Sequence, residues 1–391
     1  MDKQEALDKG LLTIIGAEID DAYMEELKKQ IIHPEIIKEQ SENIKIVYTP
    51  FHGTGLVPVK RVLSELGFKN VYIVPEQELP DPEFTTLEYP NPEDPKAFEL
   101  ALKLAKEKNA DIVLATDPDA DRLGIYALDT KTGKYMPFTG NMSGLIIAEY
   151  QFRERTKCGL MPKNPAMVKT IVTTNMADPL AADYNVNLIE VLTGFKFIGE
   201  QIKFFEQNNS YNFVMGMEES YGCLVGTYAR DKDAPVAVMC LCEAAAYCKS
   251  QGITLWDHML DLYEKYGYYK EGLYITLKGV TGAEKIRKIM SSLRAESLTQ
   301  IDTLKVLKVR DYEKNTITDL ATGEVTESGL PQSNVLYYDL EDGAWACVRP
   351  SGTEPKIKLY YGIKGTSLDD ADAKLEALQT ALVEKLNKLA E

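Results

Sequence analysis

Short apolar runs alternate with amphipathic stretches along residues 41–150 of the chain. Apolar residues recurring every three or four positions are typical of a helix with one buried face, whereas short continuous apolar runs are typical of buried strands. Such alternation predicts an α/β domain built on a largely parallel sheet. The predicted strands are 45–49, 71–75 and 111–117, and the predicted helices are 56–68, 95–109 and 140–156.

The same alternation restarts after residue 150 and continues to about residue 270. It therefore predicts a second α/β domain, 151–270, of similar length and order. Its strand-like runs are 166–174, 187–193 and 212–218, and its helix-like runs are 196–209, 234–250 and 254–267.

Beyond residue 270 the apolar positions alternate at period two in runs such as KVLKVRDY, VLYYDL and KIKLYYGI. With helical stretches at 283–296 and from Leu368 onward, this pattern predicts a smaller α+β domain, 271–391, over an antiparallel sheet. Residues 1–40 contain only short helical stretches and are not expected to form a domain. The predicted fold class is α/β, with two α/β domains followed by the α+β domain.

Composition narrows the classes of protein that fit. The 391 residues are too many for a single core, and two to four domains are expected. The formal net charge of −16 argues against general binding to nucleic acid or to anionic membranes. The chain has no apolar run long enough to cross a membrane and no secretory signal pattern at its start, so a cytoplasmic protein is expected.

Four of the six cysteines fall between residues 223 and 248. Such crowding fits either a structural zinc site or buried, reduced thiols. The chain has no C-x-x-C motif, and three of these cysteines lie in the apolar, helix-like run 234–250. Buried thiols are the preferred interpretation.

Three aspartates, Asp117, Asp119 and Asp121, follow the apolar run DIVLA and are closed by Arg122. Carboxylates at alternate positions share one face of a strand, and in a loop just past the strand they can converge on one point. Two carboxylates about 4 Å apart repel by about 4 kcal/mol at an effective dielectric constant of about 20, so a cation between them is expected. Oxygen ligands at this density suit Mg²⁺ or Ca²⁺.

An EF-hand does not fit, because Arg122 stands where that motif needs glycine and Leu128 where it needs glutamate. Three carboxylates leave open positions on an octahedral ion, which favours Mg²⁺ shared with a phosphate group. Arg122 supports this interpretation, since a guanidinium binds phosphate oxygens as a fork. The alternative is a solvated acidic turn.

The segment RPSGTEPKIKLYY predicts a phosphate-binding turn. Ser351 and Thr353 offer hydroxyl groups, and Gly352 allows backbone N–H groups to converge. Arg349 before the turn and Lys358 after it would supply positive charge. A plain hairpin turn is the alternative, because Ser-Gly dipeptides are common in such turns.

Two further stretches carry candidate polar residues. In GMEESYG, the side chains of Glu218, Glu219 and Ser220 could hydrogen-bond sugar hydroxyls, although for this motif alone an exposed acidic turn is the favoured explanation. In RDKD, Lys232 could contact a phosphate or transfer a proton, and a surface charge cluster is the alternative.

These motifs, in this order, resemble the α-D-phosphohexomutase family of phosphoglucomutases and phosphomannomutases. The resemblance extends over nearly the whole chain. TDPDADR and RPSGTEP carry most of the specificity, and the remaining motifs add order and spacing. The matching motifs are TPFHGTG (49–55), TDPDADR (116–122), TGFKFIGE (193–200), GMEESYG (216–222), RDKD (230–233) and RPSGTEPKIKLY (349–360).

The resemblance implies mixed-sheet α/β domains of phosphohexomutase type and a site divided among them. Family members have four domains, so 41–150 corresponds to the second, 151–270 to the third and 271–391 to the fourth. The residues whose roles carry over are Asp117, Asp119 and Asp121 as ligands of an essential Mg²⁺, Arg122 at the reacting phosphoryl group, Glu218 and Ser220 on sugar hydroxyls, and Arg349, Ser351, Gly352, Thr353 and Lys358 on the non-reacting phosphate. Lys232 matches a family lysine near the substrate, and His52 matches a position for which packing is favoured over catalysis.

The family nucleophile, a phosphoserine in a first-domain loop resembling T-A-S-H-N-P, has no counterpart here, because none of the three histidines follows a serine. Residues 1–40 resemble the end of the first domain and its linker. The chain is therefore expected to be a truncated phosphoglucomutase-type isomerase, inactive alone, whose exposed face would favour artificial dimers; its natural oligomeric state cannot be read from the sequence.

The GMEESYG form of the sugar loop resembles the glucose-phosphate type. A phosphomannomutase, a phosphopentomutase of the same family and a non-catalytic sugar-phosphate-binding module remain alternatives, and a Ca²⁺-stabilised structural protein is the least favoured class.

Overall fold

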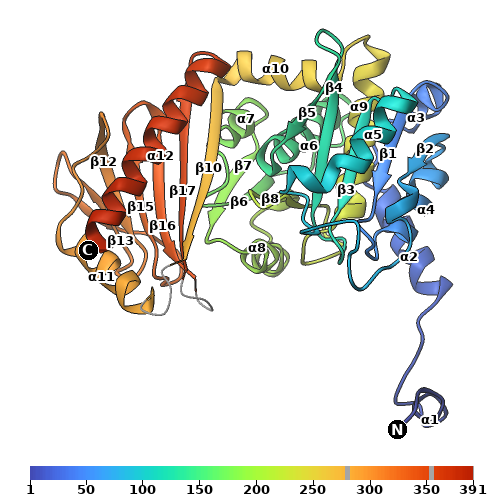
Figure 1. Ribbon diagram of the computed structural model, residues 1–391, viewed down its shortest axis with the longest axis horizontal. Helices are drawn as coiled ribbons and strands as arrows, with labels where there is room; N and C mark the ends of the chain where they lie inside the picture. Colours follow the sequence, from blue (N-terminus) through green and yellow to red (C-terminus); the bar gives the residue numbers. More distant parts are fainter. Residues whose placement is uncertain (278–281, 352–355, 391) are drawn as a thin grey trace. The chain divides into compact units, whose positions relative to one another are not determined.

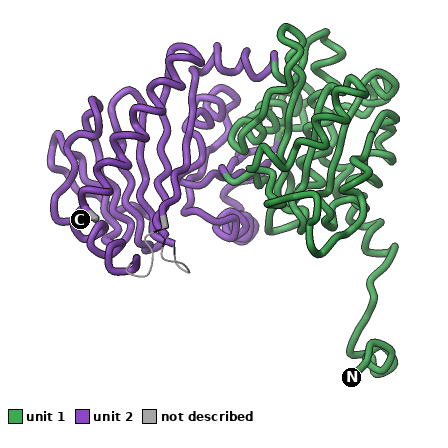
Figure 2. The backbone as a smooth tube through the Cα atoms, viewed as in Figure 1, with its two compact units in different colours: residues 1–161, 220–256 green, residues 162–219, 257–391 purple. Residues whose placement is uncertain are grey.

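The computed structural model describes residues 1–277, 282–351 and 356–390. The chain divides into two compact units, shown in Figure 2: unit 1 comprises 1–161 and 220–256, and unit 2 comprises 162–219 and 257–391. Mixed α/β sheets and a C-terminal antiparallel sheet give the predicted fold class. Among the described residues, no helix combines the length and hydropathy that crossing a bilayer requires.

Unit 1 is built on a mixed sheet with the strand order β2-β1-β3-β4-β5 (Figure 1). The first three strands run parallel; β1 and β3 bury their central residues, as the apolar runs predict, whereas the residues of β2 are half-buried. The last two strands form an antiparallel extension that begins directly after the acidic motif. The strands are β1 (Lys45–Thr49), β2 (Asn70–Ile73), β3 (Ile112–Thr116), β4 (Leu123–Asp129) and β5 (Lys134–Phe138).

Helices contact this sheet according to how their apolar residues are distributed. Helix α5 contacts β1 and β3, while α6 and α9 contact β4. Almost every side chain of α9 is buried, because its sequence is apolar around the whole circumference. The helices are α4 (Leu56–Leu66), α5 (Glu99–Lys108), α6 (Gly140–Lys157) and α9 (Ala234–Ser250), with short 3₁₀ turns η1 (Pro75–Gln77) and η2 (Pro95–Phe98) and the strand β9 (Gly222–Val225).

The N-terminal residues form three helices, α1 (Lys3–Asp8), α2 (Ala17–Lys28) and α3 (Pro34–Gln40). Helix α1 buries no residue, whereas α2 buries Met24 and Leu27. Both α2 and α3 contact α9, so this part of the N-terminal region packs onto unit 1.

In unit 2, β6 (Pro165–Thr170) lies between β7 (Asn187–Val191) and β8 (Asn212–Glu218), and both pairings are parallel. The helices of this part are α7 (Ala177–Asp183) and α8 (Phe195–Asn208). The expected strand at 166–174 ends at Thr170, where the chain leaves the sheet.

The C-terminal part of unit 2 is the predicted antiparallel sheet, in the order β10-β17-β16-β15-β12-β13-β14, with β11 beside β12 (Figure 1). Helix α10 leads into it, and α11 and α12 pack on one of its faces. The elements are α10 (Leu255–Tyr266), β10 (Tyr268–Leu277), α11 (Gly282–Ala295), β11 (Gln300–Ile301), β12 (Leu304–Asp311), β13 (Thr316–Asp319), β14 (Val325–Glu327), β15 (Leu336–Leu340), η3 (Glu341–Gly343), β16 (Trp345–Pro350), β17 (Lys356–Gly365) and α12 (Leu368–Ala390).

The period-two pattern of this sheet reflects two buried faces. Tyr338 and Val348 belong to the core that includes α11 and α12. Tyr337 and Trp345 point to the opposite face, where they stack with ring centroids 5.4 Å apart and pack with Ile171 of the same unit. Alternate residues therefore serve different cores.

Candidate functional site

The three aspartates lie in the tight loop between β3 and the antiparallel strand β4. The first carboxylate organises this loop. Asp117 Oδ1 accepts the backbone N–H groups of Asp121 at 3.0 Å and Arg122 at 2.9 Å, and the Asp117 N–H donates to the Arg122 carbonyl at 3.3 Å. Loop geometry thus depends on a carboxylate that is also a candidate metal ligand.

The structure brings the carboxylate oxygens of Asp117, Asp119 and Asp121 within 4.8 Å of one another. Burial, reinforced by the charges of Asp121 and Asp119, raises the pKa of Asp117 to about 7 against the lowering effect of its amide donors. Crowded carboxylates of this kind gain stability from a cation between them, and an all-oxygen donor set suits Mg²⁺. The residues present therefore fit a divalent cation.

Two cationic side chains flank the same loop. The Arg122 guanidinium lies 3.7 Å from Asp121, 3.9 Å from Asp117 and 3.7 Å from Glu93. Its Nε is buried, and within the described residues it has no hydrogen-bond partner. Lys232 Nζ lies 2.8 Å from Asp121 Oδ2, with only 12% of its side chain exposed. The structure thus places both predicted cations of this group beside the acidic loop.

The motif TPFHGTG (49–55), which precedes the acidic loop in the sequence, contacts the backbone of that loop. The Thr54 N–H donates to the Pro118 carbonyl at 2.8 Å, and Gly53 allows the two backbones to approach closely. His52 is buried; its Nδ1 lies 2.8 Å from the Leu79 carbonyl oxygen and its Nε2 lies 2.8 Å from Thr86 Oγ1. Both ring nitrogens are engaged within the fold, in keeping with the packing role preferred for His52.

The segment from Ser220 to Ala234 also forms backbone hydrogen bonds with the acidic loop and with the strand that follows it. The Leu123 N–H donates to the Tyr221 carbonyl at 3.0 Å, and the Ala234 N–H donates to the Ala120 carbonyl at 3.1 Å. Ser220 lies in the turn before β9 and belongs to unit 1. The acidic loop is therefore fixed by backbone bonds from distant parts of the sequence.

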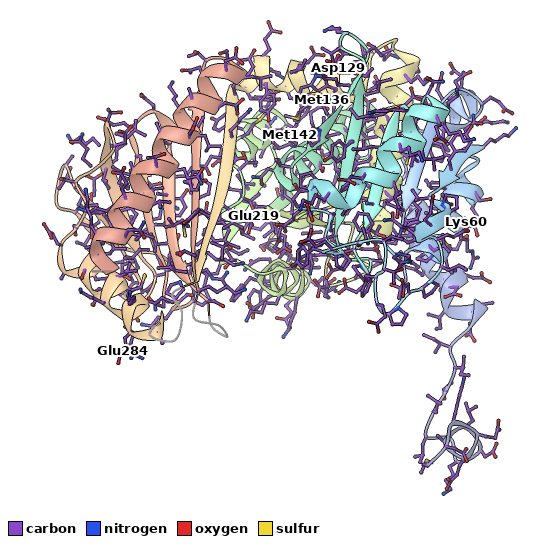
Figure 3. All side chains as sticks on the ribbon, viewed as in Figure 1. Lys60, Asp129, Met136, Met142, Glu219 and Glu284 are labelled. Atoms are coloured by element: carbon purple, nitrogen blue, oxygen red, sulfur yellow. The ribbon has the colours of Figure 1, made fainter. Side chains whose placement is uncertain are left out.

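In unit 2, strand β8 ends at the buried Glu218, and Glu219, labelled in Figure 3, follows it. Glu219 Oε2 accepts the Thr170 hydroxyl at 3.1 Å. Burial and the neighbouring Glu218 charge raise the pKa of Glu219 to about 7, opposed by Thr170 and by the charge of Lys358. The sequence places Glu219 in the motif, but it gives no sign of the Thr170 contact, which only the fold creates.

Strands β16 and β17 carry the described part of the segment RPSGTEPKIKLYY. Arg349 and Lys358 are direct cross-strand partners, and the Ser351 N–H donates to the Lys356 carbonyl at 2.8 Å to close the hairpin. Gly352 and Thr353, also predicted to bind phosphate, lie outside the described residues. Within unit 2 the charge of Lys358 lowers the pKa of Glu219, so this carboxyl group and strand β17 interact electrostatically.

All six cysteines lie in the described residues, and none of them forms a disulfide bond. Cys223, Cys240, Cys242 and Cys248 are buried, and Cys158 is exposed. Burial raises the pKa of the Cys223 thiol to about 12, which keeps it protonated and unreactive.

Comparison with known proteins identifies three matching domain models of the phosphoglucomutase/phosphomannomutase family. They are the α/β/α domain II at residues 21–130, the α/β/α domain III at 139–266 and the C-terminal domain at 295–378. Among curated relatives, the phosphoglucomutase of Staphylococcus saprophyticus is 35% identical over 95% of this chain and 66% of its own length. The phosphoglucomutase of Staphylococcus epidermidis is 38% identical over 84% of this chain and 59% of its own length.

Solved structures show the same fold at lower sequence identity. The Paramecium phosphoglucomutase parafusin, in an open form, has a TM-score of 0.64 at 19% identity, covering 95% of this chain and 62% of its own. A Burkholderia thailandensis protein of the phosphoglucomutase/phosphomannomutase family has a TM-score of 0.60 at 17% identity, covering 95% and 64%. The chain thus spans roughly two thirds, or less, of the length of these curated and structural relatives.

Proposed function

Because the chain belongs to the phosphoglucomutase/phosphomannomutase family, we propose that it carries the metal-binding, sugar-binding and phosphate-binding parts of a phosphoglucomutase-type enzyme. Such an enzyme interconverts a hexose 1-phosphate and a hexose 6-phosphate through a bisphosphate intermediate. The observation that carries the proposal is the convergence of three carboxylates in one loop, with Arg122 and Lys232 beside them.

We assign Asp117, Asp119 and Asp121 as ligands of Mg²⁺. When bound there, the ion neutralises charge on the transferring phosphoryl group. Arg122 is proposed to bind the oxygens of that group, which accords with a guanidinium Nε that has no hydrogen-bond partner among the described residues. Lys232 is proposed to act near the same group as a charge-stabilising or proton-transferring side chain.

Sugar and phosphate recognition is assigned to the remaining candidates. Glu218 and Ser220 are proposed to accept or donate hydrogen bonds at sugar hydroxyls. The non-reacting phosphate is proposed to bind the turn formed by Arg349, Ser351, Gly352, Thr353 and Lys358.

The domain division is also a proposal. We assign 41–150 as the metal-binding domain, 151–270 as the sugar-binding domain and 271–391 as the phosphate-binding domain, with 1–40 as a first-domain remnant and linker. The matched domain II model begins earlier, at residue 21, which accords with the packing of α2 and α3 onto unit 1.

We further propose that this chain alone does not turn over substrate, because the sequence has no serine followed by histidine to serve as the family nucleophile. A coupled assay with glucose 1-phosphate, catalytic glucose 1,6-bisphosphate and Mg²⁺ tests this. No conversion above the blank is expected. Turnover at an ordinary mutase rate would show that another residue acts as the nucleophile.

The ligand-binding part of the proposal has its own test. Glucose 6-phosphate is expected to bind the chain in calorimetric titration, and Lys358→Met is expected to weaken this binding about tenfold or more, because a charged hydrogen bond is lost. Lys364→Met, on the same strand β17, is the matched control and should bind as the unchanged chain does. Equal affinities for both variants would contradict the assigned phosphate turn.

The GMEESYG loop favours glucose phosphates, so mannose 6-phosphate and ribose 5-phosphate are expected to bind more weakly in the same titrations. Tighter binding of either one would favour the phosphomannomutase or phosphopentomutase alternative. A non-catalytic sugar-phosphate-binding module is the second candidate, favoured by the presence of the sugar and phosphate residues without the serine loop. Binding of glucose 6-phosphate by a chain that shows no Mg²⁺ binding in calorimetric titration would favour this second candidate.

A further inference from the structure

Two residues of the N-terminal region lie against the segment that joins β9 to α9. The amide side chain of Gln30 closes over Gly226, where an added Cβ would lie 2.6 Å from Gln30 Nε2. Further along, the Tyr23 hydroxyl donates to both carboxylate oxygens of Asp233, each at 2.8 Å. All of these residues belong to unit 1. The region just before residue 41 therefore contacts the segment that carries Lys232.

Asp233 is a buried carboxylate with an organised set of donors. Only 8% of it is exposed, and the Tyr228 hydroxyl is a second donor to it. It also caps helix α9 by accepting the Val236 N–H at 3.4 Å, while its own N–H donates to the Cys223 carbonyl at 2.9 Å. A buried carboxylate depends on such donors, since each one lost leaves charge unsolvated.

Both chain neighbours of Asp233 contact the acidic loop. Before it, Lys232 Nζ lies 2.8 Å from Asp121 Oδ2. After it, the Ala234 N–H donates to the Ala120 carbonyl at 3.1 Å. Fixing the Asp233 carboxylate therefore fixes the backbone from which both of these contacts reach the loop.

We propose that Tyr23 is a positioning residue for the candidate metal site, acting through Asp233 on the loop that contains Asp117, Asp119 and Asp121. The Tyr23 hydroxyl hydrogen-bonds Asp233, which caps α9, and the neighbours of Asp233 in the chain contact the loop: Lys232 contacts Asp121 and Ala234 contacts Ala120. A loop that is already ordered loses less conformational entropy when a cation binds it. The inference rests on the proposed Mg²⁺ site.

The variant Tyr23→Phe tests the inference, because it removes one hydroxyl and keeps the ring. The control is Tyr135→Phe, which also removes a hydroxyl bonded within unit 1, in this case to the Ala105 and Ala110 carbonyls at 3.0 and 2.8 Å. Mn²⁺ is the probe, with its affinity measured by electron paramagnetic resonance. Tyr23→Phe is expected to weaken Mn²⁺ binding about three- to tenfold, because the Asp233 carboxylate loses one of its hydroxyl donors. Tyr135→Phe is expected to leave Mn²⁺ binding unchanged.

Amide hydrogen exchange of the metal-free chain provides a readout that general destabilisation does not mimic. In Tyr23→Phe, exchange is expected to rise in residues 117–122 and 231–236 but not in β5, and Tyr135→Phe should show the reverse. Tyr228→Phe removes the other hydroxyl from the same carboxylate and should weaken Mn²⁺ binding as Tyr23→Phe does.

The results distinguish the positioning role of Tyr23 from the existence of the metal site. Mn²⁺ binding that is equal in the unchanged chain, Tyr23→Phe and Tyr228→Phe, without local change in exchange, would overturn the positioning role while leaving the metal site intact. No Mn²⁺ binding by the unchanged chain would overturn the metal site itself, and the positioning role with it.

Discussion

Gly53 stands where two backbones meet, since a Cβ built on it would lie only 2.3 Å from the Pro118 Cα. Pro118 belongs to the acidic loop and its carbonyl accepts the Thr54 N–H at 2.8 Å. A methyl group at residue 53 therefore cannot be accommodated by a side-chain rotation, and the loop backbone must move. The TPFHGTG motif thus acts on the candidate site indirectly, because Gly53 leaves room for the backbone of the loop that carries the carboxylates.

We predict that Gly53→Ala lowers the free energy of unfolding by about 1–3 kcal/mol and weakens Mg²⁺ binding, because overpacking displaces Pro118 between Asp117 and Asp119. Urea unfolding and calorimetric titration with Mg²⁺ measure the two effects. Gly16→Ala is the control, since an added Cβ there meets no atom within 4 Å. If Gly53→Ala matched Gly16→Ala in both measurements, the close approach of Gly53 to Pro118 would be shown to affect neither stability nor Mg²⁺ binding.

Single residues differ in how far the sequence reveals them. Asp117, Asp119 and Asp121 can be identified because their spacing and the preceding apolar strand are local features. Glu219 could be seen as part of a motif, but its contact with Thr170, 49 residues away, could not. Tyr23 gave no signal, because its partner Asp233 is 210 residues away and lies beside it only after α2 packs onto unit 1.

Among the elements, the contact between the N-terminal region and α9 includes a buried carboxyl group. Glu243 on α9 is fully buried and accepts the backbone N–H groups of Ile32, at 2.8 Å, and His33. Burial raises the pKa of the Glu243 carboxyl from 4.5 to about 7, in spite of these donors. The folded chain therefore binds a proton there that the unfolded chain releases between about pH 4.5 and 7.

Where the folded state binds more protons than the unfolded state, stability falls as pH rises. We predict that Glu243→Gln, which keeps an acceptor oxygen, becomes more stable relative to the unchanged chain by about 2–3 kcal/mol between pH 5 and pH 8. Urea unfolding at several pH values measures the difference. Glu107→Gln, at an exposed position of α5, should show a flat difference, and a flat difference for Glu243→Gln would refute the burial argument.

The elements predicted from periodicity are those whose pattern is set by local packing. The predicted strand 212–218 and helix 234–250 match β8 and α9 at both ends. The hairpin β4–β5 was not identified; its antiparallel direction comes from the pairing of β4 with β3, which the sequence pattern does not reveal. The N-terminal helices were seen, but their packing on α9 was not, since it depends on a surface formed by distant residues.

For the whole molecule, the net charge of −16 means that anions are repelled unless a local cluster of cations attracts them. Among the described residues, each unit places two basic side chains at its candidate site. Unit 1 has Arg122 and Lys232 beside the candidate metal ligands, and unit 2 has Arg349 and Lys358 on its hairpin. The candidate chemistry is therefore divided between the units, with cation binding assigned to one and the non-reacting phosphate to the other.

This division predicts that two ligands protect different parts of the chain from amide hydrogen exchange. Mg²⁺ is expected to slow exchange in residues 117–122 and 231–236 of unit 1, and glucose 6-phosphate to slow exchange in β16 and β17 of unit 2, because a ligand stabilises the segments it binds. Asp119→Asn should remove most of the Mg²⁺ effect and leave glucose 6-phosphate protection of β16 and β17 in place. Lys358→Met should do the opposite. Protection of unit 2 by Mg²⁺ alone, with none in 117–122, would contradict the assignment of the metal to the acidic loop, since a bound cation must first order the carboxylates that hold it.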